Sequence, residues 1–258
     1  SWLQRNIPAD ARAMAIDVSS SMAVLGVMGP RSRELLSKLT DADMSPAAFP
    51  FGTSQIIDLG YARVRASRIT YVGELGWELY IPTECAPGVF DALMQAAPSV
   101  GGRLAGYHAL NSLRMEKGYR HWGHDISDED TPLQSGLGFA VAMKKPGGFI
   151  GLEALQAQNE AGLTRRLVQF ALDDATPLLY HNEPIWRDGT IVGRISSGMF
   201  GHYLGKSLGM GYVECQTQGE APDAILQGKY EIEVAGVRYS AQASLAPWYD
   251  PSSARIKV

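Results

Sequence analysis

The sequence predicts an α/β (α+β) unit over residues 1–162, followed by a small β-barrel over residues 163–258. In the first part, segments with helical spacing of apolar residues lie between segments that alternate or are rich in β-branched residues. In the second part, short strand-like segments follow one another with Gly or Pro between them, which is typical of a small barrel. A chain of 258 residues is long enough for two such domains.

In the first part, short alternating or apolar segments predict strands at residues 14–18, 23–28, 54–58, 61–70 and 77–81. The spacing of leucines and other apolar residues predicts helices at residues 31–39, 83–97 and 106–119. Thr83 is expected to cap the second helix, and Gly118 to close the third. These helices are expected to pack on the sheets.

The second part begins after a helix predicted at residues 152–161, which Gly162 ends. Strands are predicted at residues 165–172, 183–186, 190–197, 208–214, 229–234 and 237–246. Asp188-Gly189 is a strong signal for a two-residue hairpin turn, and Ala235-Gly236 is a weaker one.

Composition excludes several classes of protein. The chain is 45% hydrophobic and 19% charged, which is ordinary for a soluble globular protein. The net charge of −4, without a run of Lys or Arg, argues against nucleic-acid binding. The sequence has no apolar run of about 18 residues, so no membrane-spanning helix is predicted. Cys85 and Cys215 stand outside any CxxC, so we expect a reducing compartment, the cytoplasm or, in a eukaryote, the mitochondrial matrix.

Residues 68–80 contain the most informative pattern in the chain. Residues 68–72 and 77–81 are predicted to be the arms of a hairpin that turns at Gly73 and Gly76. Because alternate side chains of a strand share a face, Trp77, Leu79 and Ile81 are expected on one side and Glu78 and Tyr80 on the other.

This pairing places the Glu78 carboxylate beside the Tyr80 phenol, with Tyr71 near them across the hairpin. A carboxylate walled by aromatic rings suits a flat heterocycle that offers two adjacent N–H donors, because the carboxylate accepts both hydrogen bonds. The alternative is a surface hairpin with one solvated glutamate.

The segment Tyr71-Val-Gly-Glu-Leu-Gly-Trp-Glu-Leu-Tyr80 resembles the pterin-binding hairpin of the glycine-cleavage T-protein (aminomethyltransferase) superfamily, above all the branch fused to sarcosine and dimethylglycine dehydrogenases. The resemblance implies that Glu78 grips the pterin of tetrahydrofolate while Tyr71 and Tyr80 line the site. It also implies folate contacts for Leu79, which lies between them, and for Phe139, at another aromatic position of that branch.

Further segments extend this resemblance over nearly the whole chain. The ending Pro247-Trp-Tyr-Asp-Pro251 is similar to the family's final segment, which follows a C-terminal β-barrel. In T-proteins proper, an arginine that contacts folate stands where this chain has Leu110. This departure argues against a T-protein of glycine cleavage and agrees with the dehydrogenase-fused branch.

The resemblance begins partway through the family's pattern, and the first residues have neither an initiator Met nor a signal peptide's apolar core. The unmatched first third carries the aspartate regarded as the key catalytic group, so no catalytic residue is assigned here. No GxGxxG occurs, so FAD is expected only on an absent domain or partner chain. We expect the chain alone not to catalyse, and to associate with the missing N-terminal region, a flavin domain or itself.

The resemblance implies tetrahydrofolate-dependent transfer of a one-carbon unit from a small N-methyl amine, such as sarcosine or dimethylglycine, within a larger oxidase or dehydrogenase. Two alternatives remain. The chain could be a non-catalytic folate-binding or assembly module, or an aminomethyltransferase of glycine cleavage. A FAD-type domain encoded directly upstream would favour the enzyme.

Two further pairs of polar residues have structural interpretations. His121 and His124 have a spacing seen in metal sites, but no third ligand follows at a helical offset, so we expect stacking or hydrogen-bonding roles and no metal. Arg114 and Glu116 are interpreted as a local ion pair on a helix surface.

Overall fold

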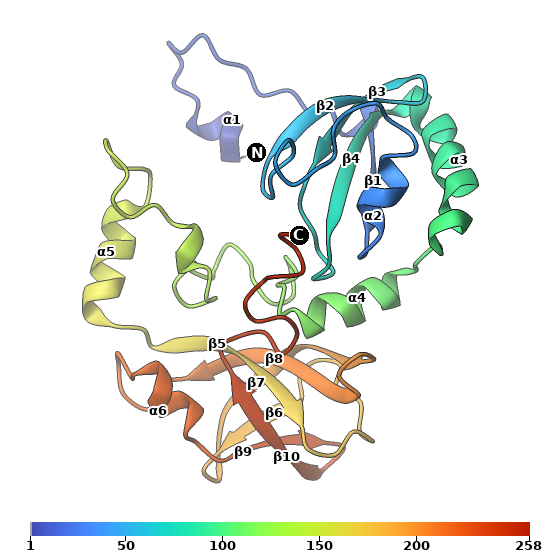
Figure 1. Ribbon diagram of the computed structural model, residues 1–258. Helices are drawn as coiled ribbons and strands as arrows, with labels where there is room; N and C mark the ends of the chain where they lie inside the picture. Colours follow the sequence, from blue (N-terminus) through green and yellow to red (C-terminus); the bar gives the residue numbers. More distant parts are fainter. Residues whose placement is uncertain (1) are drawn as a thin grey trace. The chain divides into compact units, whose positions relative to one another are not determined.

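The computed structural model describes residues 2–258, which form two compact units. The first unit comprises the residues up to 70, residues 74–104 and residues 255–258; the second comprises residues 71–73 and 105–254. Figure 1 shows the helices and strands of both. The expected division of the chain at residue 162 falls inside the second unit and stays a prediction.

The first unit is built on a four-stranded antiparallel sheet with the strand order β1-β4-β3-β2. Its strands are β1 (Met22–Met28), β2 (Ser54–Leu59), β3 (Ala62–Ser67) and β4 (Gly76–Pro82). Its α-helices are α1 (Trp2–Asn6), α2 (Ser32–Leu36) and α3 (Ala86–Ala96), and short 3-10 turns lie at Ser19–Ser21, Thr83–Cys85 and Ala97–Val100. The mixed helix and sheet content predicted for this part is confirmed.

The core of the first unit lies on one face of the sheet. Trp77, Leu79 and Ile81, at alternate positions of β4, are all 0% exposed. They belong to one apolar cluster with Leu36 of α2 and Val89 of α3. Removing an apolar side chain of this size from water stabilises the fold by about 1.5–3 kcal/mol. The alternation predicted along β4 is therefore confirmed, and it leaves the intervening polar side chains on the other face.

The strand expected at residues 14–18 is absent from the structure, where this stretch is irregular. Met14, Ile16 and Val18 are 81%, 71% and 57% exposed. β1 begins only at Met22 and pairs with β4 alone. An apolar run forms a strand only where a neighbouring strand satisfies its backbone groups, and within residues 2–258 none pairs with this stretch.

The prediction of a first hairpin strand at residues 68–72 is also wrong, because these residues do not form a strand. The ladder between β3 and β4 ends at Ser67, which lies opposite Glu78. The backbone N–H of Arg68 donates to Thr53 O (2.9 Å), and its carbonyl accepts from the N–H of Gly52 (2.9 Å). The side chain of Arg68 is 1% exposed and donates to Phe49 O (2.6 Å). Because the Arg68 side chain is buried and its backbone bonds to residues 52 and 53, pairing with β4 stops at Ser67.

The helix predicted at residues 83–97 is confirmed as a 3-10 turn followed by α3. Thr83 does not cap it: its hydroxyl donates to Ser20 O (3.0 Å), and no side chain caps α3. Val89 and Leu93 are buried as the spacing predicts, whereas Phe90 is 39% exposed.

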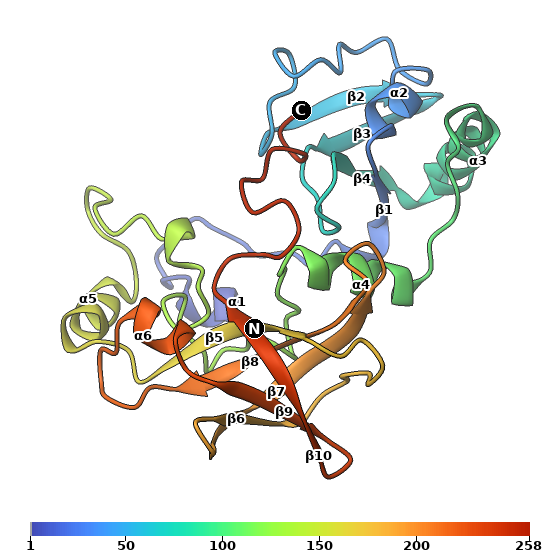
Figure 2. The same ribbon diagram turned by 60° about the horizontal axis from the view of Figure 1, so that its bottom comes forward.

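The second unit contains a closed barrel with the strand order β10-β5-β8-β7-β6-β9 (Figure 2). Its strands are β5 (Arg165–Leu172), β6 (Pro184–Arg187), β7 (Thr190–Gly201), β8 (Lys206–Glu214), β9 (Tyr230–Val234) and β10 (Val237–Ser244). Its helices are α4 (Tyr107–Glu116), α5 (Leu152–Ala161) and α6 (Pro222–Leu226), with a 3-10 turn at Gly138–Ala140. The six predicted barrel strands and the helix that ends at Gly162 are confirmed.

The turns of the barrel follow their sequence signals. Asp188 (φ 52°) and Gly189 (φ 82°) join β6 to β7, and Ala235 (φ 51°) and Gly236 (φ 81°) join β9 to β10. Positive φ at both central residues is the backbone of the tight hairpin turn that matches the twist of the strands. Both predicted hairpins are therefore confirmed.

Polar residues of α4 attach this helix to the barrel of its own unit. Ser112 donates to Phe200 O (2.7 Å). The Glu116 carboxylate, 2% exposed, accepts from the backbone N–H groups of Tyr203 (2.7 Å) and Leu204 (3.1 Å). Since Glu116 is satisfied by the β7–β8 turn, its expected ion pair with Arg114 is wrong. The helix expected at residues 106–119, α4, belongs to the second unit, whereas the four-stranded sheet belongs to the first.

Candidate ligand site

Glu78 and Tyr80 lie side by side on β4, on the face opposite the core. The Tyr80 hydroxyl donates to Glu78 Oε2 at 2.7 Å. This hydrogen bond to a carboxylate, together with burial, raises the pKa of Tyr80 above its ordinary value. The phenol is therefore a hydrogen-bond donor at neutral pH, and it holds one carboxylate oxygen in place.

Small neighbours leave room around Glu78. Its cross-strand partners are Gly26 on β1 and Ser67 on β3. Cross-strand side chains lie about 4.5–5.5 Å apart, so larger residues at these two positions would cover the carboxylate. Among the contacts within residues 2–258, Oε1 of Glu78 accepts no hydrogen bond. One carboxylate oxygen is therefore oriented by Tyr80, and the other is open to a donor from outside the chain.

Leu79 lies on the other face of the same strand. Its side chain is 0% exposed and belongs to the core cluster. The Leu79 side chain therefore cannot contact a ligand bound beside Glu78. Only its backbone groups are left for the expected contact with the ligand.

Tyr71 and Phe139 line one cavity of about 380 Å³ in the second unit. The Tyr71 hydroxyl donates to Arg120 O (2.9 Å), and its ring stacks on that of Tyr119, with centroids 5.9 Å apart and planes 9° apart. Burial raises the pKa of Tyr71 and of Tyr119. Phe139, in the 3-10 turn, is 86% exposed. The cavity offers flat aromatic surface beside cationic side chains.

Lys117 is one of the residues that line this cavity, and its side chain is 2% exposed. Its ammonium group forms an ion pair with Asp250 (3.1 Å), whose side chain is 6% exposed. The contact attaches the segment 247–251 to the end of α4. Arg120 donates to Ser135 O (3.0 Å) and Gly118 O (2.7 Å), which holds the loop after α4. No Asp or Glu is among the residues that line the cavity.

The structure thus brings the expected site residues together as two pairs. Glu78 and Tyr80 belong to the first unit, and Tyr71 and Phe139 to the second. Tyr119, which stacks on Tyr71, was not expected. Its only sequence signal was its place after the helix-ending Gly118, because stacking across a loop leaves no periodic pattern.

His121 and His124 make ring contacts, as the sequence predicts. Their centroids lie 4.5 Å apart with planes at 32°, and His121 Nε2 lies 3.5 Å from the Tyr107 hydroxyl. Over residues 2–258, no three His, Cys, Asp or Glu side chains form a group that could hold a metal ion. Burial and the neighbouring His124 lower the pKa of His121.

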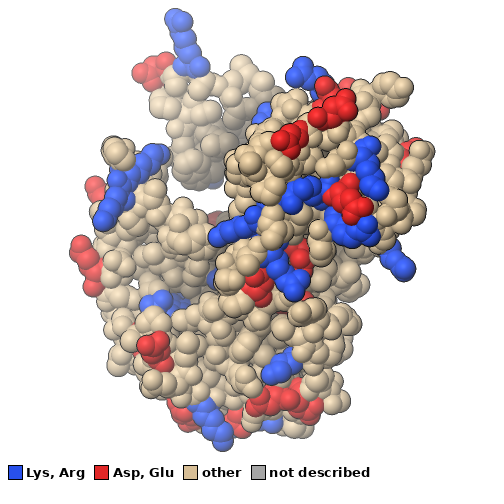
Figure 3. Space-filling model, viewed as in Figure 1, with Lys and Arg blue, Asp and Glu red and all other residues tan. Residues whose placement is uncertain are grey.

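Charges and helix lengths add two observations. On the face drawn in Figure 3, acidic and basic side chains are interspersed over the surface. None of the helices within residues 2–258 combines the length and the apolar character needed to cross a membrane.

Two family models match the chain. The GCVT N-terminal domain matches residues 1–145, and the glycine cleavage T-protein C-terminal barrel domain matches residues 165–250. Among solved structures, the chain is similar to the glycine cleavage system aminomethyltransferase T from Bartonella henselae, with a TM-score of 0.74 and 22% identity over 89% of this chain and 60% of that one. This similarity establishes the fold.

Two curated proteins are similar at higher identity. The 4-methylaminobutanoate oxidase (formaldehyde-forming) of Paenarthrobacter nicotinovorans is 41% identical over 95% of this chain and 29% of its own length. The mitochondrial sarcosine dehydrogenase of Homo sapiens is 41% identical over 96% of this chain and 27% of its own length. The chain therefore spans less than a third of these two relatives.

Proposed function

Because the chain belongs to the glycine-cleavage T-protein family, we propose that it binds tetrahydrofolate and takes part in one-carbon transfer from a small N-methyl amine. The observation that supports this best is the Glu78–Tyr80 pair, in which one carboxylate oxygen is held at 2.7 Å by a phenol and the other is open. This carboxylate would accept hydrogen bonds from two neighbouring N–H groups of a pterin ring.

In the second unit, the aromatic cavity gives separate support for a ligand with a conjugated ring system. The stacked Tyr71 and Tyr119, with Phe139 at the rim, offer the flat apolar surface that a conjugated ring system needs. Arg120 lines the same cavity and suits an anionic part of a ligand, whereas Lys117 is already paired with Asp250. A volume of about 380 Å³ lies in the range of small-molecule sites.

Tetrahydrofolate would supply amine nitrogens that accept the one-carbon unit. The protein's part is to hold and orient it. Within the first unit, Glu78 would fix one ring edge and Tyr80 would keep the carboxylate in place. The names of the two relatives support the substrate class, since sarcosine and 4-methylaminobutanoate are both N-methyl amino acids. Flavin chemistry is proposed to lie outside this chain.

A second candidate is a folate-binding module without turnover. It is favoured by one observation, that the residues lining the aromatic cavity include no carboxylate able to act as an acid or base. The two candidates differ in product. Only the enzyme would load a one-carbon unit onto tetrahydrofolate when sarcosine and a flavin oxidase are supplied.

The test is Glu78→Gln, with Glu84→Gln as the matched control. Glu84 lies in the 3-10 turn after β4 and is exposed. Calorimetry with tetrahydrofolate on the full-length protein should show a loss of about 1.5–3 kcal/mol for Glu78→Gln, because an amide accepts at one oxygen only and turns a donor toward the pterin. Glu84→Gln should bind like the wild type. Equal affinity of wild type and Glu78→Gln would reject the folate assignment.

A further inference from the structure

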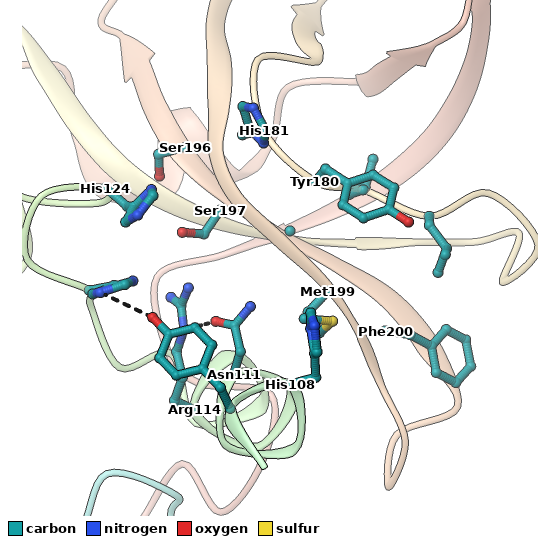
Figure 4. Close-up of a pocket in the computed structure, with 15 residues that line it drawn as sticks. His108, Asn111, Arg114, His124, Tyr180, His181, Ser196, Ser197, Met199 and Phe200 are labelled. Carbon is teal, nitrogen blue, oxygen red and sulfur yellow. Dashed lines mark hydrogen bonds between the residues drawn. The ribbon is translucent and has the colours of Figure 1, made fainter.

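A second cavity of about 340 Å³ lies in the second unit, between α4, the 121–124 turn, the 178–181 segment and β7 (Figure 4). The chain has five histidines, and four of them line this cavity: His108, His121, His124 and His181. Figure 4 shows His108, His124 and His181 around the same space, together with the hydroxyl groups of Ser196 and Ser197. We call it the histidine cavity.

No carboxylate lines the histidine cavity. Its polar side chains are imidazoles, hydroxyls, the amide of Asn111 and the guanidinium of Arg114. Two acids contact residues of the wall. Asp125 is 1% exposed as a residue and is engaged with Arg114 and Ser196, and Glu183 accepts a hydrogen bond from the backbone N–H of Tyr180 (2.9 Å). Protonated imidazoles on the wall would therefore face no acidic side chain in the cavity.

The same contacts keep the wall rigid. Arg114 Nε donates to Asn111 Oδ1 (2.7 Å), and Arg114 Nη1 donates to Asp125 Oδ2 (2.7 Å). Ser196 donates to Asp125 Oδ1 (2.5 Å), which joins the turn after α4 to β7. The backbone N–H of His121 also donates to Asp125 Oδ2 (2.9 Å), so the turn that carries His121 and His124 is held in place, which lowers the entropic cost of binding a ligand there.

We propose that the histidine cavity binds a small organic anion with two or more carboxylates. Hydrogen bonds from imidazolium and hydroxyl groups to carboxylates are charge-assisted and are the strong ones in such sites. The volume is within the range of small-molecule sites. This ligand could be a free di- or tricarboxylic acid or glutamates attached to another molecule.

The histidine cavity is separate from the aromatic cavity of Tyr71 and Phe139, because the two share no lining residue. The proposal is therefore independent of folate binding at Glu78.

Binding is expected to strengthen as the imidazoles gain protons. The titratable and charged groups that line the cavity are the four histidines, Tyr107, Tyr180 and Arg114; Asp125 and Glu183 contact lining residues from outside it. Since charge-assisted hydrogen bonds need protonated imidazoles, lowering the pH from 8 to 6 should tighten anion binding by about tenfold, with the smallest contribution from His121, whose pKa is lowered by burial and by His124.

The experiment follows the imidazole resonances of the protein by NMR at pH 6 while citrate, or the tripeptide Glu-Glu-Glu, is added. Saturable shifts of His108, His124 and His181 are expected, with binding about tenfold weaker at pH 8. Saturation by citrate alone would identify a free acid as the class of ligand, and tighter binding of the peptide would identify attached glutamates. Absence of saturable shifts with both probes would overturn the proposal.

Variants separate the cavity from general surface charge. The double variant His124→Gln and His181→Asn replaces two exposed imidazoles with neutral amides, which still donate hydrogen bonds but carry no charge, and should weaken citrate binding by about tenfold or more. The control is His202→Gln, the fifth histidine, which packs on Phe200 and does not line the cavity. Wild-type affinity in the double variant, or equal binding of uncharged triethyl citrate, would refute the proposal.

Discussion

The guanidinium of Arg114 and the carboxylate of Asp125 form an ion pair of 2.7 Å between side chains that are 2% and 0% exposed. Asp125 also accepts from the backbone N–H of His121 (2.9 Å) and from the Ser196 hydroxyl (2.5 Å). One carboxylate therefore connects α4, the turn that follows it and strand β7. It fixes one wall of the histidine cavity.

Asp125→Asn should destabilise the protein by about 2–4 kcal/mol, because it leaves the Arg114 guanidinium buried without a counter-charge. Asp128→Asn, in the same loop but exposed, is the control and should change the free energy of unfolding by less than about 0.5 kcal/mol. Urea unfolding measures both. Similar values for the two variants would show that the buried pair adds no more than a surface charge.

Tyr80 should titrate above the ordinary tyrosine range, since its hydroxyl donates to the Glu78 carboxylate and is partly buried. Ionising the phenol would remove this donor and place two negative charges together. Glu78→Gln removes the charge, so it should lower the pKa of Tyr80 toward its ordinary value. NMR of ¹³C-labelled tyrosine across alkaline pH follows this titration. An unchanged pKa in the variant would show that the carboxylate is not what perturbs the phenol.

Tyr230 should make stability fall at alkaline pH. Its side chain lies in the barrel core, its hydroxyl donates to Ile225 O (2.9 Å), and burial raises its pKa to about 12. Between the unfolded pKa of about 10 and the folded value, the unfolded state has lost a proton that the folded state keeps. Stability from this group is thus complete below about pH 10 and is lost as the pH rises to about 12.

Tyr230→Phe tests this assignment. The wild type should lose about 1 kcal/mol more than the variant when the pH is raised from 9 to 11, because the variant has no phenol to ionise. Urea unfolding at both pH values measures the difference. Tyr61→Phe is the control, since Tyr61 is fully exposed and should leave the pH dependence as in the wild type. Parallel profiles for wild type and Tyr230→Phe would contradict the prediction.

The barrel could be predicted from the sequence almost strand by strand. The strands contain β-branched and aromatic residues, and several of their ends are marked by local chemistry such as Asp188-Gly189 and Gly162. The alternation along β4, which places Glu78 and Tyr80 on one face, was predicted for the same reason. The alternation of side chains along a strand and the preference of residues for tight turns depend on neighbouring residues, so both can be predicted from a single sequence.

Pairing between strands that are far apart in the chain could not be predicted from the sequence. Residues 14–18 have a strand-like composition but lie exposed, because strand formation needs a partner as well as a suitable sequence. Arg68 belongs to an alternating run, yet its buried side chain and its backbone hydrogen bonds to residues 52 and 53 end the strand before it.

The sequence by itself determined the positions of the barrel strands along the chain, their two tight turns and the Glu78–Tyr80 pair, all of which depend on residues close together in the chain. The tertiary structure alone decided that Arg114 pairs with Asp125 and that Glu116 binds the β7–β8 turn. It also grouped four histidines from three separate segments around one cavity. Buried charges take the partners that packing brings within hydrogen-bonding distance, and local spacing along a helix does not specify which those are.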